Sequence, residues 1–306
     1  MTAWAYRVLL AKVVLDFLHF NRLAIRDGLG NGLMTLVPTR PQPDSTAAIS
    51  LLTRALETDR SYFELAANIE PLPGAVLAWM PGLTASPAGA VIHRVQPAVI
   101  AALGEAWVAQ AEGALAGVAV ELARIYLDAR GGPADELLRS AGYADRDELV
   151  FAASLEDPAP GLTLWPVKTD EDWERKLRFH AEIPTSPDGH GNHPAEWVAL
   201  ERRKCAAGMD AYLAELDGET VGAIGAVWGD QLLRMKNLVV HPAHRRRAIG
   251  RAMLNQLAAI GRERGISEQC ILAVRGDEGE LLYRAAGMQV VGTQVEWSKQ
   301  IGGSIQ

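Results

Sequence analysis

The sequence predicts an α/β protein that consists of two related units in tandem. Apolar runs of β type alternate with segments of helical periodicity, and the second half of the chain repeats the order of the first. The 306 residues also suit about two domains of ordinary size. Since 49% of the residues are hydrophobic, the chain can bury a real core.

A constant offset of 145 residues relates the two halves. Gln96–Ala98 corresponds to His241–Ala243, and Leu137–Tyr143 corresponds to Leu282–Met288. A period of this length indicates the duplication of a domain and not a solenoid of short repeats.

The predicted boundaries follow from breaks in composition. Acidic residues, prolines and glycine gather at 155–161, as they do in linkers. We therefore predict one domain at 34–155, called the first repeat, and one at 162–300, called the second repeat. Residues 1–33 are predicted to be an N-terminal helical extension. Charged residues interrupt their apolar stretch, which argues against a membrane span, and no small-residue cleavage site follows at the distance that a signal peptide requires. We also hypothesise that the native protein starts at Met34.

Each repeat is predicted to run strand, helix, strand, helix, strand. In the first repeat these elements are Gly89–Val95, Pro97–Gly117, Ala123–Asp128, Pro133–Ser140 and Glu148–Ala153. In the second repeat they are Leu232–Val240, Arg247–Gly265, Gln269–Val274, Glu278–Ala286 and Gln289–Trp297. A turn at Asp217-Gly218, followed by the strand pattern Glu219–Trp228, predicts a hairpin ahead of them.

The net charge and the positions of the cysteines argue against some classes of partner and site. A net charge of −7 and a pI near 5.6 argue against nucleic acid as the main partner. The two cysteines, Cys205 and Cys270, have no disulfide or metal spacing, which suits a reducing cytoplasm. His190 and His193 share a polar loop but lack further ligands, so no metal site is predicted. The oligomeric state is not indicated.

The stretch Leu238–Gly250 carries the most specific chemistry. An apolar strand ends at His-Pro, a turn with three arginines follows, and a helical pattern begins near Gly250. The first amides of a helix have no internal partner and lie at the positive end of its dipole. Arginines add charge-assisted hydrogen bonds to phosphate. The stretch therefore predicts a phosphate-binding site.

This stretch resembles the acyl-CoA pyrophosphate loop of the GNAT N-acetyltransferase superfamily, with the pattern Arg/Gln-x-x-Gly-x-Gly/Ala. Arg245, Ala248 and Gly250 occupy the patterned positions, and Ala248 replaces the first glycine. The tandem arrangement resembles two-unit members of that superfamily. The resemblance implies, in each unit, a mixed and mostly antiparallel twisted sheet flanked by helices. It also implies acetyl-CoA as the acyl donor, with no metal.

The resemblance further implies the site residues. Those that contact acetyl-CoA are Leu238, Val239, Val240, Arg245, Arg246, Arg247, Ala248, Ile249, Gly250 and Arg251. The run from Leu282 to Met288 resembles the family's Leu-Tyr-x-x-x-Gly-Phe, in which the tyrosine protonates the leaving thiolate. Tyr283 matches that tyrosine, and a phenol with a pKa near 10 stays protonated at neutral pH and suits the role.

The first repeat lacks this chemistry. Its equivalent loop, Val99–Glu105, contains no cation, and Glu105 would repel a pyrophosphate. Leu138 stands in the place of Tyr283 and cannot transfer a proton. We therefore expect the first repeat to be a degenerate copy that supports the fold and walls the acceptor site.

The general base is left open. No carboxylate stands where the family places one, since the strand offers Arg234, Lys236 and Asn237 and the next strand offers Ala273. Either water carries the amine proton away, or one of His180, His190 and His193 accepts it.

These observations predict an acyl-CoA-dependent N-acyltransferase that moves an acetyl group from acetyl-CoA to a primary amine of a small molecule or peptide by direct attack. The alternative is a non-catalytic acyl-CoA-binding regulatory protein. An enzyme that acetylates proteins is a further possibility within the transferase class.

Overall fold

The computed structural model describes residues 45–84, 86, 88–154, 162–184 and 193–301. The predicted extension 1–33, the start at Met34, the linker 155–161 and His190 lie outside the described residues. Asp44–Gln306 form one compact unit, to which the following description applies.

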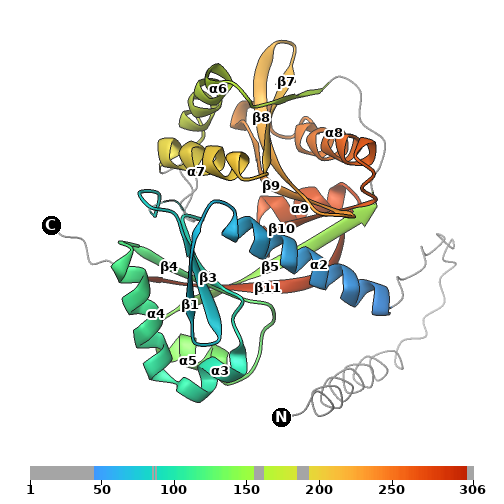
Figure 1. Ribbon diagram of the computed structural model, residues 1–306. Coiled ribbons are helices and arrows are strands. Elements are labelled where there is room, and N and C mark those ends of the chain that lie inside the picture. Colours follow the sequence, from blue (N-terminus) through green and yellow to red (C-terminus); the bar gives the residue numbers. More distant parts are fainter. Residues whose placement is uncertain (1–44, 85, 87, 155–161, 185–192, 302–306) are drawn as a thin grey trace, which may run out of the picture. The chain divides into compact units, whose positions relative to one another are not determined.

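The described residues of this unit form a central mixed sheet of eleven strands, in the order β1-β2-β3-β4-β11-β5-β10-β9-β8-β7-β6 (Figure 1). The strands are β1 Asn68–Leu72, β2 Ala75–Trp79, β3 Ala90–His93, β4 Leu122–Leu127, β5 Ala144–Ser154, β6 Thr163–Pro166, β7 Asp210–Leu216, β8 Glu219–Trp228, β9 Leu232–Val240, β10 Glu268–Val274 and β11 Gln289–Gln300. Two neighbouring pairs, β3–β4 and β9–β10, are parallel, and the others are antiparallel. The predicted mixed, mostly antiparallel sheet is confirmed.

Helices flank the sheet. They are α2 Ser45–Glu64, α3 Pro97–Leu103, α4 Glu105–Gly117, α5 Pro133–Ser140, α6 Asp170–Ala181, α7 Pro194–Ala206, α8 Ile249–Glu263 and α9 Glu278–Ala285. A single helix over Pro97–Gly117 was the expectation, but Gly104 adopts a φ of 60° and divides it into α3 and α4. Within the part of the chain that the structure describes, no helix is long and apolar enough to cross a membrane.

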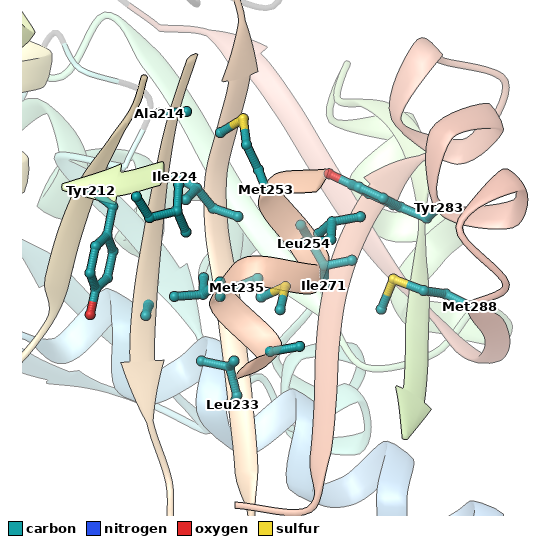
Figure 2. Packing of buried hydrophobic residues seen from close by; sticks show 14 of the residues in the cluster. Tyr212, Ala214, Ile224, Leu233, Met235, Met253, Leu254, Ile271, Tyr283 and Met288 are labelled. Atoms are coloured by element: carbon teal, nitrogen blue, oxygen red, sulfur yellow. The ribbon is translucent and has the colours of Figure 1, made fainter. Parts of the chain in front are cut away.

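The strands of the second repeat bury different side chains on their two faces. Leu233 and Met235 of β9 pack with Met253 and Leu254 of α8 (Figure 2). Leu232, one position earlier, packs against α2 on the opposite face. This alternation is the period of two that a strand covered on both sides requires. We call the two sides the α8 face and the α2 face.

The last strands of the two repeats change places. Strand β5 ends the first repeat, yet it pairs with β10 of the second, from Glu268↔Ser154 to Val274↔Glu148. Strand β11 ends the second repeat, yet it pairs with β4 of the first, and β5 and β11 also pair with each other. A strand from each repeat thus completes the sheet of the other, and the two sheets become continuous.

Candidate functional site

Strands β9 and β10 separate partway along their length. They pair in parallel from Leu232↔Glu268 to Arg234↔Cys270. Beyond these positions, residues 235–239 of β9 and 271–274 of β10 line a cavity of about 300 Å³. Backbone groups on the facing edges of the two strands can therefore bond a ligand that enters between them.

A bulge in β9 accompanies this separation. Asn237 adopts a φ of 56°, and the pairing with β8 shifts there between Ala223 and Gly225. Asparagine tolerates this left-handed conformation better than most residues. Its side-chain amide donates to Glu201 of α7 at 2.8 Å, and Glu201 forms a fully buried ion pair with Lys176 of α6 at 3.0 Å. Two helices thereby hold the bulge in place.

The predicted phosphate loop connects β9 to α8. A 3-10 turn, Pro242–His244, follows the strand, and α8 begins at Ile249. Arg246 and Ala248 both have a φ of 59°, so Ala248 occupies the left-handed conformation that favours glycine. No side chain caps the start of α8 in the described structure, which leaves its first amides open to an anion.

Two of the three arginines of this loop already contact other side chains. Arg245 pairs through Nη1 with Glu278 of α9 at 2.9 Å, and its side chain is half exposed. Arg247 Nη1 lies 2.9 Å from His244 Nδ1, while Nε2 of the same histidine lies 3.1 Å from Glu219. A pyrophosphate at this loop would replace the Arg245–Glu278 contact or share it.

The remaining loop residues differ in exposure. Arg246 and Arg251 are exposed, whereas Ile249 is buried in the core under α8. Gly250 is buried too, and a Cβ at this position would lie 2.7 Å from Leu282 Cδ2 of α9. Its missing side chain therefore lets α8 and α9 pack closely, in addition to any approach to a ligand.

Tyr283 lies at the inner side of α9. Its ring packs edge-on against Phe151 of β5, with centroids 5.5 Å apart, and it lines the cavity between β9 and β10. In Figure 2 the ring extends from α9 toward Met253 of α8. Burial, followed by the nearby charge of Asp277, raises the pKa of Tyr283 above its ordinary value. The phenol thus holds its proton at neutral pH, as a proton donor to a leaving thiolate must.

The cavity reaches from one face of the sheet to the other. Asp277 and Tyr283 line it on the α8 face, and Asp59 and Tyr62 of α2 line it on the other. Leu238 and Val239, two of the residues predicted to contact the donor, form part of the wall between. The arrangement therefore leaves an opening through the sheet beside the predicted donor site.

Glu148 is an acidic residue of the cavity wall that the sequence does not single out. It comes from β5 of the first repeat and is half-buried in the cavity wall. Burial, then the charges of Glu296 and Asp59, raise the pKa of Glu148 from 4.5 to about 7. No local signal marked it, because its place beside β10 depends on the exchange of strands.

The histidines considered as bases lie elsewhere. His180 is buried in α6, where its Nε2 lies 4.0 Å from Glu201. His193 precedes the first turn of α7. Among the described residues, the cavity wall contains no histidine.

The equivalent part of the first repeat has a different local structure. Residues 97–103, which correspond to the start of the phosphate loop, form helix α3, and Glu105 stands in the first turn of α4. Leu138, in the place of Tyr283, is fully buried in an apolar core with Trp107 and Trp297.

Comparison with known proteins agrees with this geometry. The sequence model of the Acetyltransferase (GNAT) family matches residues 171–285, which contain β9, the loop, α8, β10 and α9. No curated protein sequence matches the chain.

Solved structures share the fold at low identity. A functionally unknown conserved protein from Staphylococcus epidermidis is 11% identical, with a TM-score of 0.58 over 77% of this chain and 95% of its own. A GCN5-related N-acetyltransferase from Sphaerobacter thermophilus is 20% identical, with a TM-score of 0.55 over 76% and 78%. A GCN5-related N-acetyltransferase from Kribbella flavida is 16% identical, with a TM-score of 0.52 over 85% and 96%.

The family comprises acyltransferases, and its fold implies acyl-CoA as the donor. The sequence match, the separated strands and the loop before α8 agree on the same segment. Residues 171–285 of this chain therefore form a domain of the GNAT acetyltransferase family.

Proposed function

We propose that this protein transfers an acetyl group from acetyl-CoA to a primary amine of a small molecule or peptide. The separation of β9 from β10 carries the proposal, because it opens free backbone groups next to the start of α8 and to Tyr283. An acyl-CoA with its pyrophosphate at Arg245–Arg251 would extend along Leu238–Val240 toward that tyrosine.

The proposed reaction is a direct attack. The neutral amine nitrogen forms a bond to the thioester carbonyl carbon, and a backbone N–H of β9 stabilises the oxyanion that develops. The C–S bond then breaks and leaves the CoA thiolate. Tyr283 gives its proton to the sulfur and regains one from solvent. The amine nitrogen releases one proton to water as the amide forms.

A regulatory acyl-CoA-binding protein is the second candidate. Two features favour it: Ala248 replaces the first glycine of the family pattern, in a left-handed conformation, and the second repeat has no carboxylate where the family places the general base. The first departs from the usual donor loop, and the second leaves that strand without a base for the amine.

Two measurements separate the candidates. Calorimetry with acetyl-CoA tests donor binding. Release of free CoA thiol is then followed with a panel of amino acids, polyamines, amino sugars and lysine-containing peptides. Thiol release with any amine supports the transferase, and the fastest amine indicates whether the acceptor is a small molecule or a peptide. Binding without release for every amine supports the regulatory protein.

We also propose that the protein is located in the cytoplasm. Both cysteines, Cys205 and Cys270, are free thiols, as a reducing compartment favours. Labelling of both thiols immediately after denaturation of protein freshly isolated from cells would support this location, whereas oxidised thiols that label only after reduction would contradict it.

A further inference from the structure

We propose that Glu148, supplied by the first repeat, binds the acceptor amine and takes its proton in the active site of the second repeat. This inference rests on the proposed acyl transfer and adds a residue to it. It also gives the first repeat a part in the chemistry, although its own loop and Leu138 lack the donor-binding and acid groups.

The exchange of strands places Glu148 at the cavity. Strand β5 lies directly beside β10, and Glu148 is opposite Val274, which also lines the cavity. Val150 and Ala152, two and four positions further along β5, pack against α2. Because side chains alternate along a strand, Glu148 points to the same α2 face.

The donor groups lie on the opposite face. Leu149 and Phe151 of β5 belong to the core under α8, where Tyr283 packs against Phe151. A thioester held between β9 and β10 would thus have Tyr283 on one side and Glu148 on the other. The amine can approach the carbonyl from the α2 face while the thiolate leaves toward α9.

Glu148 differs from the other acidic residues of the cavity wall. Asp59 and Glu296 are each neutralised by basic side chains, and Asp277 caps the start of α9. The ion pairs are Arg234–Asp59 at 2.6 Å, Lys236–Asp59 at 3.1 Å and Arg146–Glu296 at 2.9 Å. In the described structure Glu148 accepts instead from the Gln294 side-chain amide at 3.2 Å, once that amide is oriented with its nitrogen toward the carboxylates. The ionised Glu148 carboxylate can therefore pair with the ammonium group of an acceptor.

The surrounding charges and burial hold the pKa of the Glu148 carboxyl close to neutral pH. Asp59 of α2 and Glu296 of β11 disfavour its charge, whereas Lys236 of β9 and Arg146 of β5 favour it. With burial as the largest cause, the resulting pKa is about 7. A base with this pKa is ionised in an appreciable fraction at neutral pH and still binds a proton firmly.

The proton balance is complete with groups already named. An ammonium group enters and gives one proton to the Glu148 carboxylate, which passes it to water. The neutral amine then attacks, and its second proton leaves as the amide forms. Tyr283 supplies one proton to the thiolate sulfur and recovers one from solvent, so the reaction releases one proton overall.

The test compares Glu148→Gln with Glu70→Gln, which alters an exposed carboxylate of β1 in the same repeat. Thiol release is measured from pH 6 to 10 with the fastest amine of the panel. We expect Glu148→Gln to lower kcat/KM at neutral pH by roughly 100-fold and to recover as pH rises toward the pKa of the amine. Glu70→Gln should match the wild type. Hydroxylamine, which is largely uncharged at neutral pH, should retain most of its rate with both variants.

Folding is checked separately. Acetyl-CoA calorimetry should give equal affinity for the wild type and Glu148→Gln, and Glu148→Asp, which keeps a carboxylate, should retain part of the activity. An unchanged rate and pH profile in Glu148→Gln would overturn the role of Glu148 and leave the proposed transfer standing. If the wild type binds acetyl-CoA but releases no thiol with any amine, the proposed transfer and the role of Glu148 both fail.

Discussion

The two repeats of this chain differ in the segment that follows their corresponding strands, β3 and β9. In the second repeat a turn with three arginines leads into α8, whose first amides have no side-chain cap in the described structure. In the first repeat the equivalent residues form α3, which contains no cation, and Glu105 begins α4. The same framework can therefore carry the predicted phosphate loop or replace it by a helix, depending on a few residues in one segment.

The exchange of β5 and β11 changes what this difference means. The first repeat lacks the cations and the tyrosine, but its last strand forms a wall of the cavity in the second repeat. If the first repeat does not bind the donor, as we propose, it can still contribute to acceptor chemistry in the second repeat. We propose that the two repeats divide these tasks, and the following experiments test that division.

The largest effect is expected from Tyr283→Phe. Removal of the phenol proton should lower turnover by about 100-fold with little change in acetyl-CoA affinity, because general acid catalysis has roughly this size. Steady-state thiol release and calorimetry measure the two quantities. Tyr143→Phe removes a buried phenol of the first repeat and is the matched control, which should behave as the wild type. Equal turnover in Tyr283→Phe would remove this residue from the mechanism.

Arg245→Ala should act on binding. Loss of a charge-assisted hydrogen bond to the pyrophosphate should raise the Kd for acetyl-CoA about ten-fold at low salt and less at high salt. Glu278→Gln, which frees Arg245 from its ion pair, should lower the Kd. Calorimetry at two salt concentrations measures both effects. A Kd that neither variant changes would show that the pyrophosphate binds elsewhere.

The pH dependence of stability tests the environment of Glu148. Its pKa is about 7 in the folded protein, above its ordinary 4.5. Stability contributed by the protonated form is complete below pH 4.5 and is lost as pH rises to about 7. Glutamine does not ionise in this range. The Tm of Glu148→Gln relative to that of the wild type should therefore rise by a few degrees between pH 4.5 and pH 8. A difference in Tm that is constant with pH would contradict the raised pKa.

The smallest effect is expected from Ala248→Gly. Glycine relieves a left-handed alanine, which should stabilise the folded protein by about 1 kcal/mol. Ala252→Gly, in the interior of the same helix, should instead destabilise by about 1 kcal/mol. Chemical denaturation of the two variants gives both values. Destabilisation by Ala248→Gly would mean that the loop does not adopt this conformation.

Local features of the fold could be predicted from the sequence. The bounds of β9 were predicted as Leu232–Val240, because an apolar β-type run ends there at His-Pro. The hairpin at Asp217-Gly218 is also confirmed, with φ values of 52° and 82° at the two turn residues and antiparallel pairing of β7 with β8. These features are determined by residues that are close together in the chain, so their patterns can be recognised in a single sequence.

Long-range features could not be predicted in the same way. A buried strand such as β5 has the same pattern whether its neighbour is β4 or β10, so the exchange of strands leaves no local trace. The sequence therefore places Glu148 in the first repeat alone, apart from the candidate bases of the second. The bulge at Asn237 that accompanies the separation of β9 from β10 is held by a contact with Glu201, 36 residues away in the chain.

The division between the repeats is tested most directly by hydrogen–deuterium exchange with and without saturating acetyl-CoA, combined with calorimetric stoichiometry. We predict one bound acetyl-CoA per chain, with slower amide exchange at residues 238–251 and no change at residues 97–105. Protection at residues 97–105, or two bound acetyl-CoA molecules per chain, would show that the first repeat also holds the donor and would contradict this account.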